Sequence, residues 1–308
     1  MAFGSLSFWL QGRRKSVAHR SLSIVALLAM AAAAQADGFT LKPFKDELFG
    51  YPGILSSGDG GTYAAVDYRE ERDINERDRV PERRARAKYV STDVREVQHD
   101  LSLKTDAGAI RHVAVGRTEG ARLITIYLHG QGGSRSQGVD DFAFGGNFNR
   151  IKNLMAANQG LYLSPDFTDF GEKGAAQITA LIDYYSAKSP DGRIFIACGS
   201  MGGGLCWELA EQRAVAARLG GLLLLGSFWD EGFLASPAFR AKVPVFFGHG
   251  SKDTVFPLAR QEAFYRSIRA KSPDYPVRFV RFERGTHGTP IRMTDWRETL
   301  NWMLSAGR

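Results

Sequence analysis

The fold of this chain is decided by residues 193–204, which read RIFIACGSMGGG. Residues 193–197 are mostly apolar and rich in isoleucine, a composition typical of a strand buried in a parallel sheet. The glycines at 202–204 open a segment of helical character that continues through Ala210. Ser200 lies between the two, and a serine at such a turn is held in strained backbone geometry that exposes its hydroxyl group. The stretch therefore predicts a nucleophilic serine on a sharp strand-to-helix turn.

The usual pattern around such a serine is G-x-S-x-G, and here Cys198 stands in place of the first glycine. Cysteine is small enough to fit there, and small neighbours let the helix fold back tightly against the strand.

A serine nucleophile needs a histidine base, and the chain has six histidines. Five lie in the N-terminal basic segment, in early strands or between an apolar strand and a glycine: His19, His99, His112, His129 and His249. His287 instead lies in a polar, glycine-flanked loop after the strand-like residues 277–282, near the C-terminus. We therefore predict that His287 is the base.

The carboxylate that orients this histidine is predicted to be Asp253. It lies in the loop 249–257, which leaves the carboxyl end of the buried strand 243–248, and catalytic groups gather at that edge of a parallel sheet. Asp230 and Glu231, after the preceding strand, are competing acids. Asp253 is preferred because its loop is glycine-rich and leads directly into the next helix.

Backbone amides that stabilise the oxyanion are expected at Gln131 and Met201. Gln131 lies in the glycine-rich loop 129–134, HGQGGS, where the backbone can approach a substrate carbonyl closely. Met201 follows the nucleophile at the start of a helix. The loop lacks the G-x-x-x-x-G-K-[ST] spacing of a phosphate-binding loop, so a nucleotide site is not expected.

These four elements, in the order 129–134 loop, Ser200, Asp253 and His287, resemble the α/β-hydrolase superfamily over residues 95–308. The resemblance implies a central, mostly parallel sheet flanked by helices, with little or no cap domain, and an acyl-enzyme mechanism. Within the superfamily the chain looks most like the carboxylesterase, phospholipase and dienelactone-hydrolase branches.

The alternation of strands and helices also predicts a doubly wound α/β domain. Residues 95–103 and 110–116 read as a leading antiparallel pair, and residues 293–304 as the last helix. Residues 228–241 are too short for a helical lid, so the site should be open. Aromatic residues beside it either line an acyl pocket or belong to the core: Phe142, Phe144, Phe228 and Trp229.

The N-terminus predicts export. Basic residues precede an apolar run at 22–34, and Ala34-Gln35-Ala36 supplies a small-x-small cleavage pattern, so residues 1–36 read as a signal peptide. The run is short for a membrane span, so no stable anchor is expected after cleavage. Either the general or the twin-arginine export route is open, and the destination is periplasmic or secreted.

Signal removal takes away four basic residues and no acidic one, which lowers the formal charge from +7 to +3 and gives little support for nucleic-acid binding. Residues 37–94 form an N-terminal extension that packs on the core, covers the rim of the site or stays mobile. Within it, the charge-dense residues 69–88 read as a solvated linker or surface segment.

Metal, cofactor and disulfide chemistry are not expected. No cluster of His, Cys and carboxylates has metal-ligand spacing. Cys198 and Cys206 lie on adjacent elements, and two free, buried thiols are the default expectation, with a bridge left open.

The sequence thus predicts an exported serine hydrolase acting on small-molecule carboxylic esters. A lysophospholipase, thioesterase or serine peptidase would use the same machinery. From another class of function, a non-catalytic binding protein with this fold remains open.

Overall fold

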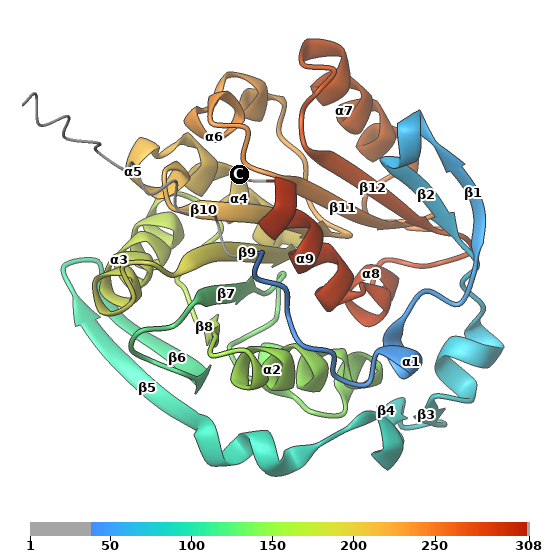
Figure 1. The fold of residues 1–308 in the computed structure, drawn as a ribbon, viewed down its shortest axis with the longest axis horizontal. Helices are drawn as coiled ribbons and strands as arrows, with labels where there is room; N and C mark the ends of the chain where they lie inside the picture. Colours follow the sequence, from blue (N-terminus) through green and yellow to red (C-terminus); the bar gives the residue numbers. More distant parts are fainter. Residues whose placement is uncertain (1–37, 307–308) are drawn as a thin grey trace, which may run out of the picture. The chain divides into compact units, whose positions relative to one another are not determined.

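The structure is a computed structural model that describes residues 38–306. The predicted signal peptide, residues 1–36, lies outside the described residues. The described residues belong to one compact unit that begins at Gly38. At its centre is a ten-stranded sheet with the order β1-β2-β12-β11-β10-β9-β7-β8-β6-β5 (Figure 1).

The strands of this sheet are β1 (Ile54–Gly58), β2 (Tyr63–Val66), β5 (Gln98–Thr105), β6 (Gly108–Gly116), β7 (Leu123–Leu128), β8 (Leu161–Pro165), β9 (Arg193–Gly199), β10 (Leu219–Leu225), β11 (Val245–Gly250) and β12 (Val277–Phe282). The seven strands from β2 to β8 in sheet order pair in parallel, whereas β1 pairs antiparallel with β2, β6 with β8 and β5 with β6. A separate two-stranded ladder joins β3 (Asp78–Arg79) and β4 (Arg84–Ala85).

Helices cover both faces of the large sheet (Figure 1). The helices are α1 (Asp46–Phe49), α2 (Asn147–Ala157), α3 (Glu172–Lys188), α4 (Gly203–Glu211), α5 (Arg213–Ala216), α6 (Pro237–Arg240), α7 (Leu258–Lys271), α8 (Thr289–Met293) and α9 (Trp296–Ala306). Apolar residues of α3, α4 and α7 belong to one core cluster, and those of α2, α8 and α9 to another.

Strand β9 shows how the sequence builds these two cores. Its side chains alternate between the faces of the sheet, as in any strand. Ile196 and Cys198 belong to the cluster with α3 and α4, and Phe195 and Ala197 to the cluster with α2 and α9. All four are fully buried, which explains why this strand reads as a continuous apolar run.

The predicted fold class is confirmed: a mostly parallel sheet lies between two layers of helices. The leading antiparallel pair is present as β5 and β6. The predicted single helix at 293–304 is wrong in one respect, because the chain forms α8 and α9 with a break at Thr294 and Asp295. Thr294 is non-helical there, with ψ of 123°, and its hydroxyl donates to the Pro290 carbonyl.

Residues 38–94 pack on the core, one of the three arrangements that the sequence left open. Strand β2 extends the large sheet by pairing in parallel with β12. The interpretation of residues 69–88 as a solvated segment is wrong for Arg77 and Asp78, which are 5% and 0% exposed. Asp78 accepts a hydrogen bond from Arg292 at 2.6 Å, and the Arg77 guanidinium lies 4.4 Å from the centroid of the Phe49 ring. Ion pairing and cation–π contacts, which composition alone does not reveal, allow this burial.

The segment after β10 holds two short elements, a 3-10 turn at Glu231–Ala235 and the four-residue helix α6. Phe233 and Phe239 of these elements are buried in the core with Trp207 and Tyr275, so the segment packs onto the domain. Across residues 38–306, none of the helices has the length and apolar character that crossing a membrane requires.

Candidate active site

Three loops at the carboxyl edge of the parallel sheet carry the predicted triad. Ser200 directly follows β9, Asp253 follows β11 and His287 follows β12. Strands β9, β10, β11 and β12 are consecutive neighbours in the sheet, so their outgoing loops lie beside one another.

The structure brings the three side chains into one hydrogen-bonded chain. His287 Nε2 lies 2.9 Å from Ser200 Oγ, and His287 Nδ1 lies 2.8 Å from Asp253 Oδ2. The carboxylate fixes the proton on Nδ1, which leaves Nε2 free to accept the proton of the serine hydroxyl. The Asp253 side chain is fully buried, whereas that of His287 is 29% exposed and open to a substrate.

Ser200 has the strained backbone predicted for it. Its φ is +52°, in the left-handed region that non-glycine residues rarely occupy. Besides the Gly203 amide, the Ser200 carbonyl accepts hydrogen bonds from the Ser227 hydroxyl at 2.7 Å and from the Phe228 amide at 3.1 Å. The last two donors belong to the loop after β10. These contacts hold the nucleophile turn in its strained form.

Glycine is required beside the serine for steric reasons. A Cβ atom at Gly202 would lie 2.6 Å from the Leu128 carbonyl oxygen, and one at Gly203 would lie 2.3 Å from Ser227 Oγ. The close approach of the turn to β7 and to the 226–228 loop therefore excludes side chains at both positions.

Asp253 is held by its own loop as well as by His287. Its Oδ1 accepts hydrogen bonds from the amides of Val255 and Phe256 at 2.8 and 3.0 Å. Burial of the carboxyl group acts to raise the pKa of Asp253, but the hydrogen bonds from His287 and these two amides outweigh it and lower that pKa. The carboxylate therefore stays ionised and continues to orient His287.

The competing acids are placed elsewhere. Asp230 Oδ1 accepts the Gly232 amide at 2.8 Å and so caps the 3-10 turn that follows it. Asp230 and Glu231 are both exposed. Asp253 is the carboxylate that the structure places on His287.

The glycine-rich loop after β7 lies against the nucleophile. A Cβ atom at Gly130 would be 2.7 Å from Ser200 Cβ, so only glycine permits this approach. Gln131 follows directly, and its backbone amide donates no hydrogen bond to another group of residues 38–306. Met201 lies in the 3-10 turn Ser200–Gly202. The oxyanion role of the two amides stays a prediction. Both residues lie beside Ser200 in the chain or in the adjoining loop, which is the position that this role requires.

Sequence reasoning underestimated His249, which it treated as a residue that shapes a loop. His249 is 1% exposed, and its Nε2 lies 2.8 Å from the Phe256 carbonyl and 3.5 Å from Asp253 Oδ2. It therefore packs against the loop that carries Asp253. Its position four residues before Asp253 is the sequence feature that could have indicated this contact.

Four aromatic residues were predicted to line an acyl pocket or the core. Phe228 and Trp229 stack with each other and contact Phe256, which in turn packs edge-on against His287. Phe228, Trp229 and Phe256 therefore form an apolar wall that meets the base through Phe256. Phe142 instead lies under the Arg84 guanidinium, 5.3 Å from it.

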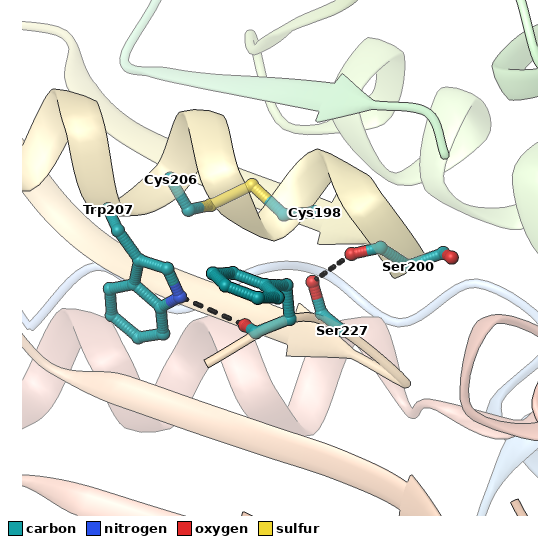
Figure 2. Close-up of a disulfide and its surroundings, with 6 residues drawn as sticks. Cys198, Ser200, Cys206, Trp207 and Ser227 are labelled. Atoms are coloured by element: carbon teal, nitrogen blue, oxygen red, sulfur yellow. Dashed lines mark hydrogen bonds between the residues drawn. A yellow bond between two sulfur atoms is a disulfide. The ribbon is translucent and has the colours of Figure 1, made fainter. Parts of the chain in front are cut away.

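The default expectation of two free thiols is wrong, because Cys198 and Cys206 form a disulfide. Figure 2 shows it beside the nucleophile turn, joining the end of β9 to helix α4. Alternation along β9 points Cys198 toward α4, and the tight turn brings the two Cα atoms to 6.4 Å. Trp207, the next residue along α4, donates from Nε1 to the Phe228 carbonyl at 2.9 Å. The disulfide therefore ties α4 to the end of β9, and the tryptophan ties it to the loop after β10.

Removing the disulfide should lower stability. The double variant Cys198→Ala/Cys206→Ala is expected to unfold with a free energy about 2–3 kcal/mol smaller, since a bridge over so short a loop restricts the unfolded chain by roughly that amount. Urea unfolding of the variant and the oxidised wild type measures the difference. Equal midpoints would contradict a stabilising bridge.

Acidification below neutral pH should also lower stability. Burial lowers the pKa of His112, His129 and His249 below the ordinary value of 6.5. Near and below pH 6.5 the unfolded chain therefore binds more protons than the folded chain, and the free energy of unfolding falls as the pH falls. We expect a lower free energy of unfolding at pH 6.0 than at pH 7.5 by urea titration. A free energy that is unchanged or higher at pH 6.0 would count against these buried neutral histidines.

Within residues 38–306, no group of three or more His, Cys, Asp or Glu side chains is arranged to hold a metal ion.

The sequence matches no model of a known protein family, and no curated protein matches it. Solved structures match in fold. An esterase from Pyrococcus furiosus is 15% identical, covers 68% of this chain and 91% of its own, and has a TM-score of 0.50. An α/β serine hydrolase homologue from Coxiella burnetii is 16% identical over 66% of this chain and 95% of its own, with a TM-score of 0.50. A thermostable esterase is 15% identical over 69% of this chain and 64% of its own, with a TM-score of 0.56. The order of the strands, the position of the nucleophile turn and these matches agree that the chain has the α/β-hydrolase fold.

Proposed function

We propose that this protein is a serine hydrolase that cleaves small carboxylic esters through an acyl-enzyme intermediate. The observation that carries the proposal is the hydrogen-bonded chain from Ser200 Oγ through the His287 ring to Asp253. The esterases among the structures of similar fold support the same activity.

In the first half of the proposed reaction, Ser200 Oγ attacks the ester carbonyl carbon while His287 Nε2 accepts the hydroxyl proton. The oxyanion that forms accepts hydrogen bonds from the amides of Gln131 and Met201, each worth roughly 3 kcal/mol in the transition state. His287 then gives its proton to the departing alcohol oxygen, and the acyl group stays on Ser200.

In the second half, His287 accepts a proton from a water molecule whose oxygen attacks the acyl carbon. The bond from that carbon to Ser200 Oγ then breaks, His287 returns the proton to Oγ, and the acid is released. Asp253 stabilises the imidazolium in both halves without itself taking a proton. The apolar wall of Phe228, Trp229 and Phe256 suits an uncharged acyl chain.

Export belongs to the same proposal. The pattern of basic residues, apolar run and Ala34-Gln35-Ala36 supports a cleaved signal peptide. The disulfide between Cys198 and Cys206 also supports an oxidising destination, the periplasm or the outside of the cell, because such bonds are rare in the cytosol.

The proposal is tested by hydrolysis of p-nitrophenyl esters of graded acyl length, with the corresponding thioesters, lysophospholipids and peptides as alternative substrates. Preferential ester turnover is expected. The acyl length at which kcat/KM peaks gives the length of acyl chain that the apolar wall accommodates. Preference for one of the other substrates would assign the same machinery to a thioesterase, lysophospholipase or peptidase. A protein that turns over none of them and is not labelled by a fluorophosphonate would be a binding protein with this fold.

A further inference from the structure

A polar cavity of about 310 Å³ lies beside the base, a volume typical of a small-ligand pocket. Thr286 and Gly288, the two neighbours of His287, line it, together with Phe144 from the loop before α2. Its other wall comes from the charge-dense residues 69–88, which the sequence had indicated to be a solvated linker or surface segment. Arg83 and Arg84 line it from that segment, and Arg292 from α8.

The walls of the cavity are held in strained backbone conformations. Phe144 has a φ of +47° and Arg83 a φ of +50°. The Phe144 ring reaches Gly288, where a Cβ atom would lie 3.5 Å from its Cε1. Non-glycine residues in this region cost free energy and concentrate at functional sites, as Ser200 does here. Both of these strained residues therefore line the same cavity.

The loop that carries Phe144 packs directly over buried charge. A Cβ atom at Gly145 would lie 2.7 Å from both Arg292 Nη1 and Arg77 Nε, so this loop lies in close contact with the two guanidinium groups. Of these two arginines, Arg292 lines the cavity.

The three arginines that line the cavity differ in how firmly they are paired. Arg292 is buried and donates to Asp78 at 2.6 Å, and Arg84 makes two hydrogen bonds to Asp140, at 3.2 and 3.1 Å. Arg83 makes a single contact to Glu70, at 3.3 Å, between side chains that are 63% and 57% exposed. A pair of that kind contributes little, so Arg83 can exchange it for an anion in the cavity.

The position of the cavity indicates which half of the substrate it receives. During acylation His287 protonates the alcohol oxygen as it leaves, so the alcohol half of an ester must extend past His287. Thr286 and Gly288, on either side of His287 in the chain, are among the residues that line the cavity. The apolar wall of Phe228, Trp229 and Phe256 meets the same ring through Phe256 and is left to the acyl half.

We propose that this cavity is a subsite for an anionic group, a carboxylate or a phosphate, on the alcohol half of the ester, and that Arg83 is its main contact. The proposal rests on the proposed ester hydrolysis and specifies the substrate class. It also assigns a function to residues 82–84 of the extension, which form the rim of the site rather than a linker.

The test compares 4-acetoxybenzoate, whose leaving group carries a carboxylate, with the uncharged amide 4-acetoxybenzamide. The measured quantity is the ratio of kcat/KM for the anionic ester to kcat/KM for the neutral one. Because the intrinsic reactivities of the two esters are the same for every enzyme variant, they cancel when the ratios of two variants are compared. Arg83→Gln is expected to lower the ratio about fivefold relative to wild type, chiefly through KM for the anionic ester.

Two further variants sharpen the comparison. Arg86→Gln removes the same charge from an exposed arginine that does not line the cavity, and it should leave the ratio at the wild-type value. Glu82→Gln removes the one acidic side chain of the lining and should raise the ratio. An acyl-side pair, p-nitrophenyl hydrogen succinate and p-nitrophenyl valerate, should show no comparable change with Arg83→Gln.

An unchanged ratio in Arg83→Gln, or an equal fall in Arg83→Gln and Arg86→Gln, overturns the subsite, since the second result is a general effect of surface charge. A change confined to the acyl-side pair overturns the assignment to the alcohol half. If the wild type hydrolyses neutral esters but none of these variants alters the ratio, the subsite fails and the proposed function stands. If it hydrolyses no ester and reacts with no fluorophosphonate, both fail.

Discussion

Replacing Ser200 by alanine is expected to lower kcat/KM for ester hydrolysis by about 10⁴-fold or more. The Ser200 hydroxyl is the group that His287 deprotonates, with Oγ 2.9 Å from His287 Nε2. Alanine has no group that could act as the nucleophile in its place. Removing the nucleophile of a working triad typically has an effect of this size, and the remaining activity comes from binding and the oxyanion amides. Hydrolysis of a p-nitrophenyl ester by matched preparations measures it.

The control for this substitution is Ser56→Ala, in the edge strand β1, where the serine is exposed. It should retain wild-type activity. Both variants should unfold at urea concentrations close to that of the wild type, since Ser200 contributes strain to the fold rather than stability. A Ser200→Ala protein that keeps more than about a hundredth of the activity would contradict the nucleophile assignment.

Replacing Asp253 by asparagine is expected to lower kcat by roughly 10³- to 10⁴-fold. Asp253 Oδ2 accepts the hydrogen bond of the His287 Nδ1–H group. An asparagine amide would donate to Nδ1 instead and favour the tautomer with its proton on Nε2. That nitrogen could then no longer take the proton of Ser200.

The competing acid supplies the matched control for this prediction. Asp230→Asn changes an exposed carboxylate that caps a turn, and it should change kcat by no more than about twofold. If Asp230→Asn were the more damaging of the two, the carboxylate of the triad would be assigned to the wrong loop.

The parts of the site that could be predicted from sequence depend on one regularity of the fold. Ser200, Asp253 and His287 each follow an apolar stretch that reads as a parallel strand, and parallel strands deliver their outgoing loops to one edge of the sheet. Local patterns were enough to find them. Strand β12 also has the predicted bounds, residues 277–282.

The features that were missed depend on contacts between distant segments. The burial of Asp78 requires Arg292, more than two hundred residues later, and the pairing of β2 with β12 spans a similar separation. The disulfide is a different case, because its cysteines are only eight residues apart. Predicting it required the side of β9 that Cys198 faces and the angle at which α4 leaves the turn, neither of which a local pattern specifies.

The central claim, that Ser200 is an activated nucleophile, is tested most directly by the mass of the protein after reaction with diethyl p-nitrophenyl phosphate. The tryptic peptide 194–213 contains Ser200 as its only serine, threonine or tyrosine, so the modified residue is identified without ambiguity. We expect one diethylphosphoryl group per chain, on this peptide, with much slower labelling of Asp253→Asn. An unmodified 194–213 peptide at excess reagent, or a modification confined to another peptide, would contradict the account.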